Sequence, residues 1–139
     1  MERIVVGVDG SEVSQSALQW AIDEARRRNA VVEAIHAWHQ PFMTGYAELG
    51  EMDLGDYGTE AQKVLDAAVA AVDTAGVTVE TAVVAGGPSQ VLVEQAKGAS
   101  LLVVGSRGRG GFSGLLLGSV SQQAAHHAPC PVVIIPPAA

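Results

Sequence analysis

The stretch from Leu101 to Val120, LLVVGSRGRGGFSGLLLGSV, decides how the rest of the chain can fold. It opens with four apolar residues, Leu101 to Val104, which predict a short buried strand. Glycines then crowd the positions that follow, at Gly105, Gly108, Gly110, Gly111 and Gly114. Gly118 precedes a helical pattern that runs from Ser119 to about His127, where Pro129 stops it. The order is therefore buried strand, glycine loop and helix start.

This order predicts a site for an anion. Glycines let backbone N–H groups turn toward a ligand with no side chain in the way. The first turn of a helix adds unpaired N–H groups and a partial positive charge. Arg107 and Arg109 add formal positive charge in a chain whose net charge is −7. Each arginine either neutralises phosphate or keeps the loop solvated, and the sequence leaves both readings open.

The two commonest phosphate signatures are absent from this stretch. A P-loop needs GxxxxGK[ST], but the two lysines, Lys63 and Lys97, lie elsewhere. A dinucleotide GxGxxG fails because Ser113 stands where the third glycine belongs. What remains is Gly105, two residues, Gly108, nine residues, Gly118 and Ser119.

Around this stretch, strand and helix patterns alternate along the chain. Apolar runs predict strands from Arg3 to Asp9, Val31 to Trp38, Val77 to Ala85 and Pro131 to Pro136, with the third near a sheet edge. Helical spacing predicts helices from a Ser11 N-cap to about Asn29, from a Thr59–Gln62 capping box to Gly76, and from Pro88 to Gly98. The residues between His39 and Gly58 are predicted to form a long loop.

Such alternation predicts an α/β fold, a parallel sheet with helices on both faces. The length of 139 residues suits a single domain, from residue 1 to residue 139. Ligands bind such sheets at the carboxyl ends of the strands. If the first and fourth strands are neighbours, Asp9-Gly10-Ser11 and Gly105-Ser106-Arg107 meet in one crevice. Asp9 there either contacts a ribose or a phosphate-bound Mg²⁺, or only shapes the turn.

The glycine spacing resembles the nucleotide-binding motif of the universal stress protein family. RIVVGVDGSEVSQSALQWA, AIHAW and HHAPCPVVIIP extend this likeness over nearly the whole chain. The resemblance implies a three-layer, Rossmann-like domain of the adenine nucleotide α-hydrolase type. Its five-stranded parallel sheet would have the strand order 3-2-1-4-5.

The resemblance also implies a site for ATP with Mg²⁺. In that site Asp9 would be the residue near the metal, and Ala37 would hold the adenine edge by its backbone. The other implied ligand residues would line the ribose, the base and the phosphates: Val8, Gly10, Ser11, Val104, Gly105, Arg107, Gly108, Arg109, Gly110, Gly118, Ser119, Val120 and Ser121.

Other candidate groups favour structural roles. His36 and His39 have the spacing of a metal pair, but their side chains point to opposite faces of a strand. His126 and His127 suit the end of a helix. Cys130 has no assignable base to activate it, so packing is the favoured role. No catalytic residue is therefore assigned.

We expect an ATP-binding regulatory module of the stress-response type, with weak or no hydrolysis. A slow Mg-dependent ATPase or phosphotransferase and a nucleotide-free dimeric interaction module remain alternatives. A flavin carrier is disfavoured because only six aromatic residues (two each of Trp, Tyr and Phe) are available to stack on the ring.

The expected partner is a second copy, paired through the strand from Pro131 to Pro136. The acidic net charge argues against nucleic acid, and no apolar run is long enough for a membrane span. The single cysteine and the absence of a signal-peptide pattern suit the cytoplasm.

Overall fold

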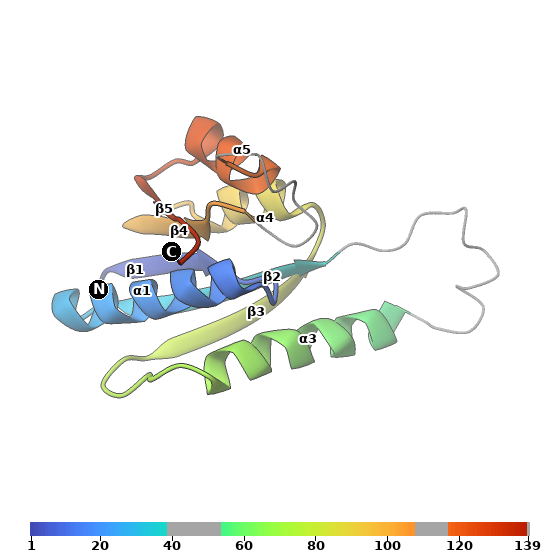
Figure 1. Cartoon of the computed structure of the whole chain (residues 1–139), viewed down its shortest axis with the longest axis horizontal. Coiled ribbons are helices and arrows are strands. Elements are labelled where there is room, and N and C mark those ends of the chain that lie inside the picture. The colour runs from blue at the N-terminus through green and yellow to red at the C-terminus, as the bar shows by residue number, and fades with distance from the viewer. Residues whose placement is uncertain (39–53, 108–116, 139) are drawn as a thin grey trace.

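The computed structural model describes residues 1–38, 54–107 and 117–138 (Figure 1). Within these ranges, five parallel strands form one sheet in the order β3-β2-β1-β4-β5. The strands are β1 (Arg3–Gly7), β2 (Val31–Trp38), β3 (Val79–Ala85), β4 (Leu101–Gly105) and β5 (Val132–Ile135). The helices are α1 (Glu12–Arg28), α3 (Leu54–Ala70), α4 (Pro88–Gln95) and α5 (Ser119–His127). The predicted α/β fold and strand order are confirmed.

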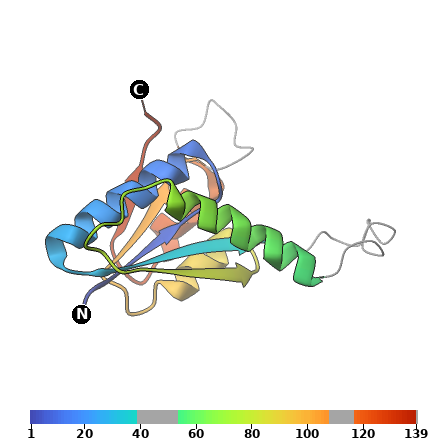
Figure 2. The same ribbon diagram turned by 90° about the horizontal axis from the view of Figure 1, so that it is seen from below.

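The helices cover both faces of the sheet and make three layers. Helices α1 and α3 lie on one face, and α4 and α5 lie on the other (Figures 1 and 2). Two separate clusters of buried side chains fill the spaces between the layers. The sheet is therefore covered as parallel sheets usually are.

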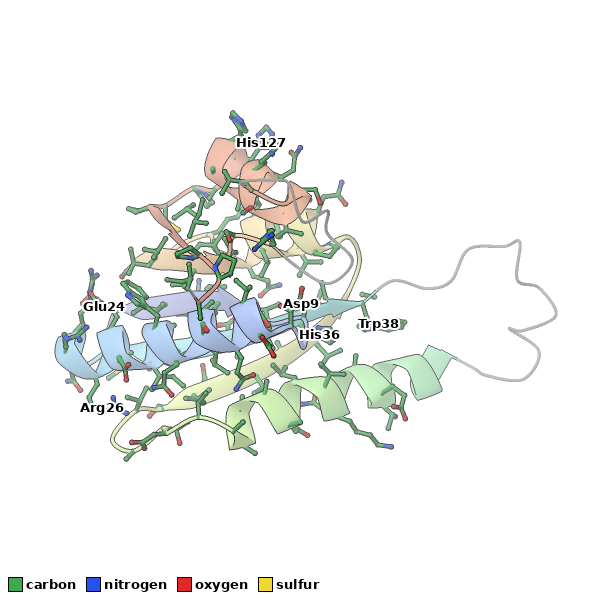
Figure 3. The ribbon with its side chains drawn as sticks, viewed as in Figure 1. Asp9, Glu24, Arg26, His36, Trp38 and His127 are labelled. Carbon is green, nitrogen blue, oxygen red and sulfur yellow. The ribbon has the colours of Figure 1, made fainter. Side chains whose placement is uncertain are left out.

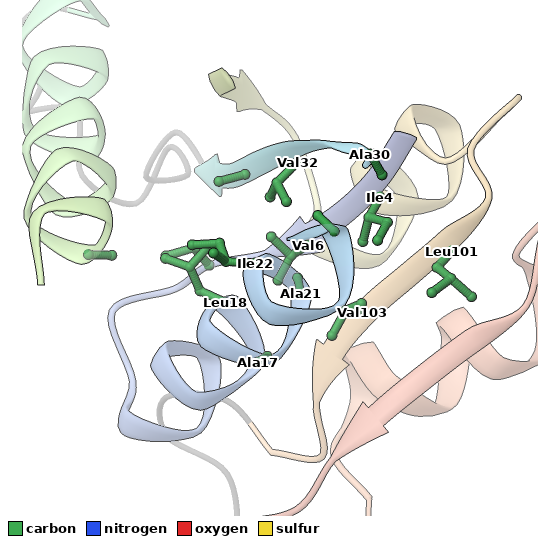
Figure 4. Packing of buried hydrophobic residues seen from close by; sticks show 14 of the residues in the cluster. Ile4, Val6, Ala17, Leu18, Ala21, Ile22, Ala30, Val32, Leu101 and Val103 are labelled. Atoms are coloured by element: carbon green, nitrogen blue, oxygen red, sulfur yellow. The ribbon is translucent and has the colours of Figure 1, made fainter. Parts of the chain in front are cut away.

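The continuous apolar runs are buried on both faces, as their pattern predicts. In β1, Ile4 and Val6 face the α1 side, whereas Val5 faces the α4 side. All three side chains are fully buried. In β4, Leu101 and Val103 face the α1 side (Figure 4). Because successive side chains point to opposite faces, one short run fills both cores.

Helix α1 begins and ends where its capping residues predict. The Ser11 hydroxyl accepts a hydrogen bond from the Ser14 N–H, 3.2 Å away, which satisfies one unpaired donor of the first turn. Asn29 adopts the left-handed conformation, with φ 57°, that commonly ends a helix.

The start of α3 differs from the prediction. The helix begins at Leu54, five residues before the predicted Thr59 cap, and continues through Gly55 and Gly58. Glycine costs about 1 kcal/mol relative to alanine inside a helix, so the sequence favoured a later start. At Gly58, an added Cβ would lie 3.9 Å from Cζ2 of Trp38, which is an ordinary contact distance, so this part of α3 lies near that indole. The capping-box prediction is wrong, and 39–53 lie outside the described residues.

The end of α3 also differs, because it ends at Ala70 and not near Gly76. The Asp73 carboxylate accepts a hydrogen bond from the Ala75 N–H at 3.0 Å, which holds a turn in place of a helix. The Arg26 guanidinium donates to the carbonyl oxygens of Asp73 and Ala75, at 3.2 and 3.0 Å. This contact with α1 could not be read from the local sequence.

Strands β3 and β5 form the two edges of the sheet. The edge position predicted for the third strand is confirmed, although β3 starts at Val79 and not at Val77. Helix α4 ends at Gln95, three residues before the predicted Gly98, and β5 is one residue shorter at each end than the predicted strand. Among the described helices, none is both long enough and apolar enough to cross a membrane.

Candidate functional site

Strands β1 and β4 are direct neighbours, so the segments that follow them lie at the same edge of the sheet. Val6 pairs with Val103, and β1 and β4 end one and two residues later, at Gly7 and Gly105. We call this side of the sheet the carboxyl edge. It carries the turn 8–11, the segment 105–107 and the start of α5. Asp9, His36 and Trp38 lie toward this end, whereas Glu24 and Arg26 lie toward the other (Figure 3).

The turn after β1 is held by hydrogen bonds from its own polar residues. The Asp9 carboxylate accepts from the Ser11 N–H at 2.9 Å, and the buried Ser14 hydroxyl accepts from the Asp9 N–H at 3.2 Å. Gly10 has a φ of +85°, which a residue with a side chain rarely adopts. Asp9 is half-buried. The turn-shaping role of Asp9 is therefore present in the structure, and its role as a ligand stays a prediction.

A second contact joins this turn to the glycine segment. A Cβ built on Gly105 would lie 2.6 Å from Cγ1 of Val13, in the first turn of α1. The first turn of α1 therefore packs directly against the backbone at the end of β4. This contact brings the Asp9 turn and the predicted phosphate segment together.

Ser106 is the backbone junction of the site. Its N–H donates to the Ile135 carbonyl of β5 at 2.8 Å. Its carbonyl accepts from the Gly118 N–H and, at 3.0 Å, from the Ser121 hydroxyl. The bond from the Gly118 N–H to the Ser106 carbonyl therefore holds the start of α5 next to the residue that follows β4. The Ser106 hydroxyl is itself buried and has no partner among the described residues.

Helix α5 begins at this junction, as its sequence predicts. Gly118 is the N-cap, with extended backbone, and no side chain caps the helix. Ser119 is exposed and Val120 is half-buried. A first turn with no side-chain cap offers backbone N–H groups and a partial positive charge to an anion.

The remaining predicted ligand residues fall into three groups. Val8 and Val104 are buried beneath the carboxyl edge, and Ala37 lies near the end of β2, paired with Val84. Arg107 is half-buried and makes an interaction, so it is not a free charge. Gly108, Arg109 and Gly110 lie outside the described residues.

His36 has a role that the sequence did not indicate. Its Nδ1 lies 2.7 Å from the Val8 carbonyl oxygen. A carbonyl only accepts, so Nδ1 carries the proton. His36 therefore fixes the backbone just after β1, one residue before Asp9. The sequence carries no local signal for this bond, because His36 and Val8 become neighbours only when their strands pair in the sheet.

Metal-binding side chains do not gather in the described part of the chain. No three His, Cys, Asp or Glu side chains there form a cluster that could hold a metal ion. Burial raises the pKa of the Cys130 thiol, and the charge of Arg3 offsets this to a smaller extent. A raised pKa leaves less thiolate at neutral pH, which agrees with a packing role.

Comparison with solved structures places this fold among known proteins. A universal stress protein solved in complex with cAMP is 32% identical, with a TM-score of 0.62, and covers 96% of this chain and 95% of its own. The UspA protein of Lactobacillus plantarum is 25% identical, with a TM-score of 0.72 and coverage of 96% and 97%.

Comparison with curated sequences agrees with the structural result. A universal stress protein of Mycobacterium tuberculosis is 40% identical over 133 residues, which are 94% of this chain and 44% of that protein. A homologue from Mycolicibacterium smegmatis is 38% identical over 146 residues, covering 96% of this chain and 45% of its own. This chain therefore spans less than half the length of the curated relatives it matches. The pattern of the universal stress protein family matches residues 1–136, and the chain belongs to that family.

Proposed function

We propose that this chain binds ATP with Mg²⁺ at the carboxyl edge and acts as a regulatory module of the stress response. The observation that carries the proposal is the junction at Ser106. There the uncapped start of α5 is bonded to the end of β4, directly beside the Asp9 turn. The relative solved with cAMP, at 32% identity, supports an adenine nucleotide as the ligand class.

Each part of the nucleotide has a proposed place along this edge. The phosphates would lie against the N–H groups of Ser119 and Val120, with Gly118 allowing close approach. Asp9 would hold the ribose or the metal ion. The adenine would lie toward β2, with its edge bonded to the backbone of Ala37. Because β2, β1 and β4 are consecutive in the sheet, the nucleotide would lie across the strand ends.

We propose that the chain binds the nucleotide with weak or no hydrolysis. In the described part of this edge, the Asp9 carboxylate is bonded to a backbone N–H, and His36 donates to a carbonyl. Both groups therefore help to hold the backbone at this edge, and we assign neither of them as a general base. A slow Mg-dependent ATPase or phosphotransferase is the alternative activity, and conversion of ATP to ADP by the purified chain would distinguish it from pure binding.

We propose further that the chain is one nucleotide-binding domain, works in the cytoplasm and forms a homodimer through β5. A dimer that binds no nucleotide is the alternative from a different class. Both kinds of dimer would pair through the apolar edge of β5. Nucleotide binding decides between them.

A thermal-shift titration with millimolar Mg-ATP tests the proposed function. A ligand present at a hundred times its dissociation constant stabilises the folded state by about 2.7 kcal/mol. We expect a rise in Tm for the parent chain and none for Gly118→Val, whose side chain would occupy the space where phosphate approaches. The backbone of Gly118 is extended, with φ −80°, so valine is compatible with its conformation.

Gly87→Val is the matched control for this experiment. Gly87 is also an extended N-cap glycine with no side-chain cap, with φ −67°, but it starts α4 and takes no part in the junction at Ser106. We expect Gly87→Val to keep the ATP-induced shift. A parent chain with no shift would refute ATP binding. A shift retained by Gly118→Val would show that the phosphates bind elsewhere.

A further inference from the structure

Ser121 was predicted as a phosphate ligand, but its side chain points into the protein. It is 1% exposed, and its hydroxyl lies 3.0 Å from the carbonyl oxygens of both Ser106 and Gly118. The hydroxyl has a single proton, and both of these acceptors belong to the protein backbone, so the proton is committed within the protein. The side chain therefore has a role other than direct contact with an anion.

The two hydrogen bonds of the Ser121 hydroxyl have different structural roles. A bond from a serine to the carbonyl three residues earlier, here Gly118, is common in the first turn of a helix. The bond to Ser106 spans fifteen positions and is buried. It crosses from the start of α5 to the end of β4. Only the second bond fixes one element against the other.

The same carbonyl of Ser106 receives the N–H of Gly118. Two donors from the start of α5 thus converge on one acceptor, which is anchored in turn because the Ser106 N–H is bonded to β5. The direction in which the first-turn N–H groups of α5 point depends on this junction. Anion binding at a helix start requires that those groups converge on the ligand.

We propose that Ser121 is a positioning residue for phosphate binding, which fixes the start of α5 against the end of β4. The inference rests on the proposed nucleotide function and concerns only its phosphate end. The adenine end is assigned to β2, which is separated from β4 by β1. Loss of the Ser121 hydroxyl should therefore weaken the binding of phosphates and leave the binding of the nucleoside unchanged.

Calorimetric titration of Ser121→Ala with Mg-ATP and with adenosine tests this role. The Ser106 carbonyl keeps the Gly118 N–H but loses the buried hydroxyl that fixes α5 against it, and we expect ATP affinity to fall about tenfold. We expect adenosine affinity to equal that of the parent chain. General damage to the fold would weaken both ligands together, so the ratio of the two affinities isolates the positioning role.

Ala124→Gly is the matched control. Ala124 is fully buried in the same helix, and glycine there removes a core methyl group and lowers helix stability without touching the junction. We expect its ratio of ATP to adenosine affinity to match that of the parent. If Ser121→Ala does not fold, Ser121→Cys carries the test, because it keeps the side-chain shape and supplies only a weak donor.

Hydrogen exchange gives a second readout that needs no ligand. The Gly118 amide, which is bonded to Ser106, should exchange faster in Ser121→Ala than in Ala124→Gly. An unchanged ratio of ATP to adenosine affinity, which an equal loss for both ligands would also give, or unchanged exchange at Gly118 would overturn the proposal. A parent chain that binds neither ATP nor adenosine would refute the nucleotide function itself, and the role of Ser121 with it.

Discussion

Gly7 and Gly105 end neighbouring strands, and at each of them a helix side chain leaves no room for a Cβ. At Gly105 the added carbon would lie 2.6 Å from Cγ1 and 3.2 Å from Cβ of Val13. At Gly7 it would lie 2.7 Å from Cδ1 of Leu92, the far end of a longer side chain. Gly105, the first glycine of the predicted phosphate segment, is thus required by the packing of α1 alone.

The two glycines should respond differently to alanine. Val13 is β-branched and stiff at χ1, whereas Leu92 can rotate its methyl groups away. We predict that Gly105→Ala lowers the free energy of unfolding by about 1–3 kcal/mol, as overpacking typically does, and by more than Gly7→Ala. Urea unfolding at equilibrium measures both. Adding Val13→Ala to Gly105→Ala should recover part of the loss, since neighbouring sites are coupled. Equal losses at the two glycines would contradict the packing argument.

One arginine, Arg3, joins three elements of the fold: β1, β2 and α4. Arg3 of β1 donates to the carbonyls of Gln95 and Lys97 at 3.0 and 2.7 Å, and to the Glu33 carboxylate of β2 at 3.3 Å. The last carbonyls of a helix have no partner within it. The guanidinium supplies donors to the carboxyl end of α4 and fastens it to the sheet.

We predict that Arg3→Met lowers the free energy of unfolding by about 1–3 kcal/mol, because the substitution leaves these carbonyls without a charged donor. Methionine keeps much of the apolar stem, so the change tests the guanidinium. Arg27→Met is the control, because Arg27 is 71% exposed and pairs only with Glu24 among the described residues. An exposed pair of this kind contributes about 0.2–1 kcal/mol at most. Equal losses in chemical denaturation would show that Arg3 is an ordinary surface charge.

The elements also show where the sequence predicts structure and where it does not. Both ends of α1 were predictable because Ser11 and Asn29 act on their own helix. Both ends of α3 were not, because Gly58 packs near Trp38 and the Arg26 guanidinium holds the turn that follows. Local capping signals are read from neighbours in sequence, whereas these two contacts connect residues far apart along the chain.

The candidate site also has features that the sequence predicted and features that it did not. The glycine spacing and the apolar strands predicted that 8–11, 105–107 and the start of α5 share one edge, and the strand order confirms that arrangement. The bond from His36 to Val8 and the junction at Ser106 were missed. In both cases the acceptor is a backbone carbonyl. Every residue has one, so the sequence does not indicate which carbonyl will accept a given bond.

Strand β5 is an apolar edge of the sheet that the described residues leave incompletely covered. It ends the sheet, and its four residues are all only half-buried. Val133 and Ile135 pack on the α1 side, whereas Val132 and Ile134 pack on the α4 side. An apolar edge strand of this kind readily pairs with another strand.

The hydrogen bonds of β5 identify which backbone groups such pairing would use. The carbonyls of Pro131 and Ile135 accept from Leu102 and Ser106 of β4 and its following segment. In a parallel strand the N–H and C=O of one residue point to the same side, and the side alternates with each residue. The backbone groups of Val132 and Ile134 therefore point away from β4, toward the open edge.

We predict that the parent chain is a dimer at micromolar concentration and that Ile134→Pro converts it to a monomer. Proline removes the outward N–H of Ile134 and is tolerated on an edge strand, because the bonds to β4 do not use that group. A self-complementary pairing through one edge closes as a two-fold dimer and does not extend into a fibre. Sedimentation velocity measures the assembly, and circular dichroism checks that Ile134→Pro keeps its sheet and helices. A monomeric parent would refute the dimer, and a dimer that persists in the folded Ile134→Pro chain would place the interface elsewhere.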